Sequence, residues 1–241
     1  MTSDNDPLRE AIEAGDLAAA RRLLAADPGR LREPLRPGEN PSFRPMTVAA
    51  VNCQTAILAF LIEEGGDVME HSNFPLCRAA TRGGCVPTME LLVDQGADVD
   101  QVCQDYGPPL IYAIEGGSQD SAEFLLSRDA RIASSGPGSD GDITWDALKH
   151  AGHFSRKNPW MLPLLLNSGA DVNCDIIDQQ GGKSHNSALH NVAAKGDLNG
   201  IRLLLEHGAD PKAVNNDGKL PTEVASSRKA SELLRSAVAE R

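Results

Sequence analysis

The chain has 241 residues, and its 23 basic and 34 acidic residues give a net charge of −11 at pH 7. An acidic surface repels the phosphates of nucleic acids and of anionic lipids, so we expect neither nucleic acid nor membrane as a partner. The longest apolar run, residues 56–62, is far shorter than the ~20 residues that cross a bilayer.

A short turn motif, in its best copies Gly-Ala-Asp, recurs along the whole chain. Clear copies begin at Gly65, Gly96, Gly169 and Gly208, and degenerate copies lie at Asp27 and Asp129. Successive copies are about 31 to 40 residues apart, which straddles the ~33-residue period of one class of helical repeat. Intervals above that period indicate inserted loops.

Two short helices are predicted before each turn. The first is rich in alanine and opens at proline in residues 45–50, 75–80 and 109–114, where the missing N–H of proline costs nothing. The second carries apolar residues three and four apart, as in Ile201, Leu204 and Leu205. A glycine or a substitute is expected to end each first helix. These residues are Gly15, Cys53, Gly83, Gly117, Gly152 and Gly196.

This pattern resembles the ankyrin-repeat family over nearly the whole chain, as six repeats and a partial C-terminal capping repeat. The resemblance implies an all-α fold, an ankyrin-repeat solenoid of helix-turn-helix units with hairpin-like connecting loops. We expect a single domain over residues 1–241. Its repeats are predicted at residues 5–36, 43–71, 73–105, 107–136, 142–180, 185–215 and 218–238.

The fifth repeat departs most from the pattern. The inserted loops at residues 134–142, 154–163 and 174–186 lie in it or beside it, and it carries Trp145 and Trp160. Trp145 stands where the repeat has a leucine, so we expect it to be buried. Long loops inside a compact repeat are either functional or disordered, so a special site is expected here.

The five cysteines form no Cys-x-x-Cys pair and leave an odd one. We therefore expect reduced thiols in an intracellular protein. The acidic N-terminus, residues 1–6, shows no apolar signal segment. These features predict a cytoplasmic location, with the nucleus left open.

Motifs for chemistry are weak. Residues 136–141 match Gly-x-Gly-x-x-Gly, but no strand or long helix flanks them, and Asp140 and Asp142 would repel phosphate, so a plain loop is favoured. His150 and His153 have a possible metal spacing without a local carboxylate or thiol. We expect neither a metal nor a cofactor. His190 matches the histidine of the family's Thr-Pro-Leu-His motif, and the resemblance implies a structural role for it.

In the family, the concave face is built from the first helices and the hairpin tips. The resemblance therefore implies a non-enzymatic, monomeric module that binds a protein partner through this face. The residues carried over to the partner surface are Asn52, Arg82, Tyr106, Glu115, His150 and Lys195.

The alternative is a freestanding ankyrin scaffold adapted as an enzyme or small-molecule binder. Its acid–base residues would be Glu115, Asp142, His150 and His185, near the fourth to sixth repeats. A closed, partly apolar pocket beside His150, with a carboxylate within hydrogen-bond reach, would favour this alternative. A wide solvated groove would favour protein binding.

Overall fold

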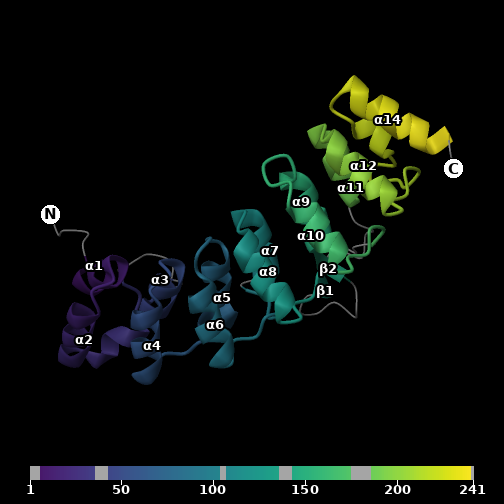
Figure 1. Ribbon diagram of the computed structural model, residues 1–241. Helices are drawn as coiled ribbons and strands as arrows, with labels where there is room; N and C mark the ends of the chain where they lie inside the picture. The colour runs from purple at the N-terminus through teal and green to yellow at the C-terminus, as the bar shows by residue number, and fades with distance from the viewer. Residues whose placement is uncertain (1–5, 36–42, 104–106, 136–142, 175–185, 240–241) are drawn as a thin grey trace. The chain divides into compact units, whose positions relative to one another are not determined.

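The computed structural model describes residues 6–35, 43–103, 107–135, 143–174 and 186–239, and Figure 1 shows its elements. Its contacts divide the chain into two compact units, an N-terminal unit, Met1–Asp129, and a C-terminal unit, Ala130–Arg241. The prediction of a single domain stays a prediction. Among the described residues, no helix is both long and apolar enough to cross a membrane.

The N-terminal unit consists of four helix pairs. The first helices of the pairs are α1 (Pro7–Ala14), α3 (Pro45–Val51), α5 (Glu70–Ala80) and α7 (Pro109–Gly116). The second helices are α2 (Leu17–Ala26), α4 (Thr55–Glu63), α6 (Val86–Asp94) and α8 (Gln119–Ser127), and a 3₁₀ turn, η1 (Pro28–Arg32), follows α2. First helices contact first helices and second helices contact second helices, which makes two parallel layers (Figure 1).

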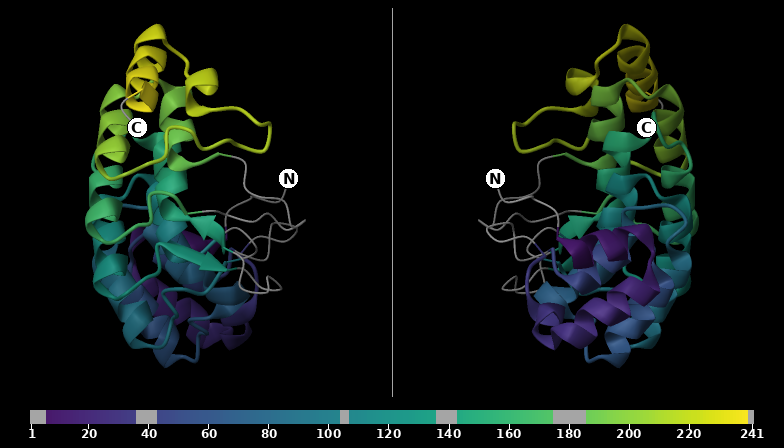
Figure 2. Two further views of the ribbon diagram at one scale, coloured as in Figure 1. Left: turned by 90° about the vertical axis from the view of Figure 1, so that its right-hand side faces the viewer. Right: turned by 90° about the vertical axis from the view of Figure 1, so that its left-hand side faces the viewer.

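The C-terminal unit repeats this arrangement. Its first helices are α9 (Ala147–Phe154), α11 (Ala188–Lys195) and α13 (Pro221–Val224), and its second helices are α10 (Met161–Asn167), α12 (Leu198–Glu206) and α14 (Arg228–Ala239). An antiparallel strand pair, β1 (Ala133–Ser135) and β2 (Ile143–Asp146), precedes α9 and pairs Ala133 with Asp146 (Figure 2). The backbone of Trp145 lies in β2, and its side chain is outside the described residues.

Several predicted helix ends are confirmed. Gly15, Gly117 and Gly196 cap α1, α7 and α11 in the left-handed conformation, with φ of 75°, 71° and 65°. Cys53 also has a positive φ, 55°, in its role as a glycine substitute. Aspartate side chains cap the other ends of helices, as Asp16 does for α2 and Asp197 for α12.

Two predicted helix boundaries are wrong. Gly152 lies inside α9, which continues to Phe154, and it is buried. A Cβ at this glycine would stand 3.0 Å from Cβ of Asn191 and 3.1 Å from the carbonyl oxygen of Ala188, so it allows α11 to approach closely. Pro75 does not open α5, because the helix begins at Glu70 and contains the proline.

His190 has the predicted structural role. Its ring nitrogens lie 2.8 Å from Oγ of Ser187 and 2.9 Å from the carbonyl oxygen of Lys219, so it ties α11 to the segment before α13. Burial lowers its pKa, although the contact with Lys219 acts in the opposite direction. A neutral imidazole in this place holds two neighbouring repeats together.

The expectation of five reduced thiols is wrong for four of them. The structure joins Cys53 to Cys85 and Cys77 to Cys103, whereas Cys174 is free. Cys53 lies in the turn before α4 and Cys85 in the turn before α6, so the stacking of repeats with a period of ~33 brings the two thiols together, 32 residues apart in the sequence.

Cys174 should be the only free thiol, and it should react slowly. Burial, with the charge of Asp146 and the hydrogen bond to it, raises the pKa of this thiol to about 12 from an ordinary value of 9.0. Iodoacetamide at pH 8 should alkylate the native protein at least about tenfold more slowly than the unfolded protein, because the thiolate reacts. Mass spectrometry measures the rate.

Asp146→Asn provides the matched variant, because asparagine also caps a helix. It should speed alkylation of the native protein. Modification of more than one thiol in unfolded, unreduced protein would contradict the two disulfides.

Glu70 is a buried carboxyl group between α3 and α5. Its Oε1 accepts hydrogen bonds from Oγ1 of Thr47, at 2.8 Å, and from the backbone N–H of Thr47, at 3.2 Å. Burial raises the pKa of Glu70 to about 6 from 4.5, and the bonds from Thr47 and the charge of Arg44 oppose the rise only in part.

Glu70 should therefore make the folded state less stable as the pH rises. Below pH 4.5 the carboxyl is protonated in both the folded and the unfolded state, so the neutral group makes its full contribution to the free energy of unfolding. This contribution is lost as the pH rises through about 6. Glu70→Gln keeps the acceptor oxygen and should be more stable than the wild type at pH 7.5, by about 2 kcal/mol. The difference should vanish near pH 4.5.

Urea unfolding of both proteins at several pH values measures this difference. A difference that stays constant from pH 4.5 to 7.5 would show that the carboxyl does not titrate as the structure implies.

Candidate functional site

In the N-terminal unit, the ends of the first helices are linked through the predicted residues Asn52 and Arg82. Asn52 follows α3, and its Nδ2 donates to the carbonyl oxygen of Val48 at 2.9 Å. The exposed Arg82 follows α5 and donates from Nη1 to the carbonyl oxygen of Val51, at 3.0 Å, and to Oδ1 of Asn52, at 3.3 Å. The two residues thus form one contact, which holds the guanidinium group at the surface.

Similar links run along this edge of the N-terminal unit. Nε2 of Gln54 donates to the carbonyl oxygen of Glu13 at 3.4 Å, and Asp120 accepts from the backbone N–H of Gly84 at 2.6 Å. Burial raises the pKa of Asp120, but hydrogen bonds from Ser118, Gly84 and Ser121 outweigh this effect and lower it. Asp120 is therefore negatively charged at neutral pH at this edge.

The other predicted residues of this unit are Glu115 and Tyr106. Glu115 is half-buried in the last turn of α7. Tyr106 lies outside the described residues.

In the C-terminal unit, the predicted residues His150 and Lys195 belong to a basic cluster. His150 is half-buried in α9, and Lys195 is exposed at the end of α11. Burial and the nearby charges of Lys195 and His150 lower the pKa of His153, and Nη1 of Arg156 donates to the carbonyl oxygen of Lys195 at 3.0 Å. We call His150, His153, Arg156 and Lys195 the basic cluster.

Arg156 was not predicted as a site residue. It lies in the insertion at residues 154–163, next to Lys157. The signal that marks it is a pair of basic residues at the start of a loop that follows directly after a first helix.

The two units differ in charge. Residues 1–129 contain 10 basic and 21 acidic side chains, a net charge of −11, whereas residues 130–241 contain 13 of each. All of the net negative charge of the chain therefore belongs to the N-terminal unit.

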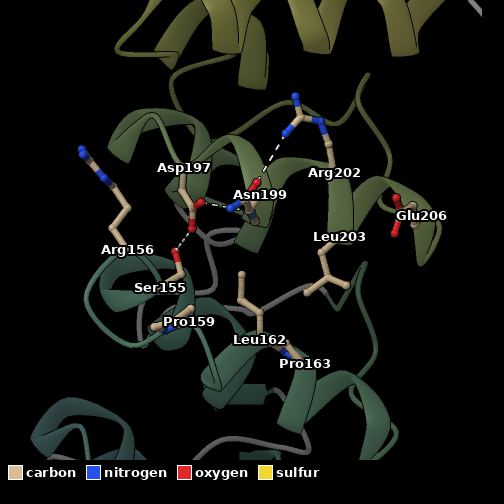
Figure 3. A pocket seen from close by; sticks show the side chains of 11 residues that line it. Ser155, Arg156, Pro159, Leu162, Pro163, Asp197, Asn199, Arg202, Leu203 and Glu206 are labelled. Atoms are coloured by element: carbon tan, nitrogen blue, oxygen red, sulfur yellow. Dashed lines mark hydrogen bonds between the residues drawn. The ribbon is translucent and has the colours of Figure 1, made fainter.

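A pocket of about 520 Å³ lies between the second helices α10 and α12 (Figure 3). It is partly open to solvent, and apolar and polar side chains contribute similarly to its walls. The residues that line it are Ser155, Arg156, Pro159, Leu162, Pro163, Asp197, Asn199, Gly200, Arg202, Leu203 and Glu206.

Hydrogen bonds hold the turn beside this pocket in place. Asp197 accepts from Oγ of Ser155 at 2.5 Å and from the backbone N–H of Gly200 at 3.0 Å (Figure 3). A Cβ at Gly200 would stand 2.7 Å from Oδ2 of Asp197, so a larger residue here would displace this carboxylate. The inserted loop is thereby fixed to the start of α12.

The acid–base set of the alternative reading is not assembled by the described residues. Asp142 and His185 lie outside them, and Glu115 and His150 belong to different units. None of the four lines the pocket between α10 and α12. Within the part of the chain that the structure describes, no group of three or more histidine, cysteine or acidic residues is placed to hold a metal ion.

Family models for ankyrin repeats match most of the chain. A model of three ankyrin repeats matches residues 46–136 and 76–176, and a model of a single ankyrin repeat matches residues 184–216.

Individual proteins show the same similarity. An ankyrin repeat protein of fowlpox virus is 27% identical over 83% of this chain and 30% of its own length. The crystal structure of the ankyrin repeat domain of Bcl-3 has a TM-score of 0.69 at 26% identity and covers 96% of this chain and 98% of that domain. That of human ASB11 has a TM-score of 0.72 at 22% identity, with 97% and 98% covered. The chain spans 8% to 30% of the length of three curated relatives that it matches.

Proposed function

Because the chain belongs to the ankyrin-repeat family, we propose that it is a non-enzymatic protein–protein interaction module that binds its partner through the concave face and the hairpin tips. The all-α solenoid of helix-turn-helix units predicted from the sequence is confirmed by the family models and by the likeness to solved ankyrin domains. A rigid surface made before binding lowers the entropy cost of association.

The contact of Arg82 with Asn52 and Val51 carries the proposal. An exposed guanidinium group held by neighbouring repeats loses little side-chain freedom when a partner carboxylate binds it. Arginine is also among the residue types that contribute most to interfaces. In the C-terminal unit, Lys195 is likewise exposed at the end of a first helix, α11.

We propose the protein as a monomer, with neither nucleic acid nor membrane among its partners. The alternative of an acid–base site has no support among the described residues, because Asp142 and His185 lie outside them and neither Glu115 nor His150 lines the pocket between α10 and α12.

A cytoplasmic location, with the nucleus left open, remains a prediction, and the two disulfides argue against it. Disulfides persist in oxidising compartments, and a cytoplasmic protein would keep its thiols reduced. The state of Cys53, Cys77, Cys85 and Cys103 in protein from its native cell therefore tests the location.

Reversal of the charge of Arg82 should weaken partner binding. Arg82→Glu should lower the amount of partner retained in affinity capture by about fivefold or more, as is typical when an interface residue that contributes over 1 kcal/mol is changed. Arg22→Glu is the matched control, because Arg22 is also exposed and lies on the second helix α2.

Circular dichroism should show the same melting temperature for both variants and the wild type. If Arg22→Glu abolished capture and Arg82→Glu did not, the partner would lie on the second helices, and the assignment to the concave face would be wrong.

A further inference from the structure

The pocket between α10 and α12 lies at a seam between two second helices, and two such seams of the N-terminal unit are bridged by ion pairs. In the N-terminal unit, Arg21 of α2 lies 3.8 Å from Glu63 at the end of α4. Arg128, which follows α8, lies 3.2 Å from Glu90 and 3.3 Å from Asp94 of α6. In that unit, two of the seams between neighbouring second helices, α2–α4 and α6–α8, thus carry ion pairs.

No such ion pair is available to α10. The helix reads Met-Leu-Pro-Leu-Leu-Leu-Asn and has no charged residue. In three repeats we compare the residue six positions before the glycine of the turn. It is Glu90 in the third repeat and Arg202 in the sixth, but the uncharged Pro163 in the fifth. The surface that α10 presents to α12 is therefore apolar, and α10 itself offers no opposite charge to Arg202 or Glu206 of α12.

Two arginines at the rim are left without a carboxylate partner. Arg156 donates to the carbonyl oxygen of Lys195, and Arg202 makes one long contact, 3.4 Å, with Oδ1 of Asn199. Among the described residues, neither forms an ion pair. Asp197, which also lines the pocket, accepts hydrogen bonds from Ser155 and Gly200 and forms no ion pair with either arginine.

The floor of the pocket is aliphatic. Leu162 and Leu203 point toward one another from α10 and α12, and Pro163 lies beside them (Figure 3). The volume, about 520 Å³, is within the range of ~300–1,000 Å³ typical of ligand sites. This volume is large enough for an aliphatic side chain and its neighbours, and the negative charge of Glu206 disfavours an acidic group beside it.

We propose that this pocket binds a short acidic segment of a protein that carries an aliphatic anchor residue. The aliphatic side chain packs on Leu162, Pro163 and Leu203, and the adjoining carboxylates pair with Arg156 and Arg202. The pocket proposal rests on the proposed function in one respect, that the occupant is a protein. It is otherwise separate, because the pocket is formed mainly by the second helices and not by the concave face.

Fluorescence polarisation tests the site with a fluorescein-labelled nonapeptide of alternating glutamate and leucine. The acidic peptide should bind and lose affinity as salt is raised, because exposed ion pairs are screened. A lysine–leucine peptide of equal length should not bind. Arg156→Glu/Arg202→Glu should weaken binding of the acidic peptide by about fivefold to tenfold, as expected for two exposed ion pairs.

Arg235→Glu, a single reversal on the exposed face of α14, is the control and should leave binding unchanged. Equal binding of both peptides, no binding of the acidic one, or no effect of the double variant overturns the proposal. Self-association in analytical ultracentrifugation that the double variant abolishes would also overturn it, because a second copy would then be the occupant.

Arg82→Glu separates the two proposals. It should leave peptide affinity unchanged while it lowers partner capture on the concave face. The double variant of the pocket should retain its melting temperature, since both arginines are at the rim and exposed.

Discussion

The close packing of the first helices is the constraint on which the rest of each unit depends. A helix pair of this length buries only one face, and the remaining apolar surface must be covered by the next pair. Gly116 and Gly152 show how tight this approach is, since a Cβ at Gly116 would overlap the backbone of Thr81, and one at Gly152 would press on α11. At these two positions the facing side of the first helix therefore requires glycine.

This packing also determines where polar groups must be satisfied. Because the first helices are so close, their ends lie side by side, and side chains at one end reach the backbone of the next. Arg82 reaches Val51, Arg156 reaches Lys195, and Asp120 reaches Gly84. A surface of this kind is both a structural joint and a place where a partner meets side chains that are already ordered.

The sequence was sufficient to predict the repeat, because a fixed period and left-handed glycines such as Gly117 and Gly196 are local signals. It was not sufficient for Gly152, whose role depends on the approach of α11 rather than on its own helix. The Cys53–Cys85 disulfide could have been predicted, because the 32-residue separation of its cysteines is close to the repeat period. The Cys77–Cys103 disulfide could not, because a separation of 26 residues does not match the period. Arg156 was missed because only the structure shows which way the inserted loop turns.

The charge of the chain acquires a different meaning when it is divided between the units. A net charge of −11 over the whole chain argues for solubility and against polyanions, but it belongs entirely to residues 1–129. The C-terminal unit has no net charge. The positive charges of the basic cluster and of the rim arginines Arg156 and Arg202 are therefore not outweighed by an excess of acidic residues in their own unit. The negative charge of the N-terminal unit thus repels an acidic segment, whereas the C-terminal unit does not. This difference favours binding at the pocket between α10 and α12, beside the insertion in the fifth repeat.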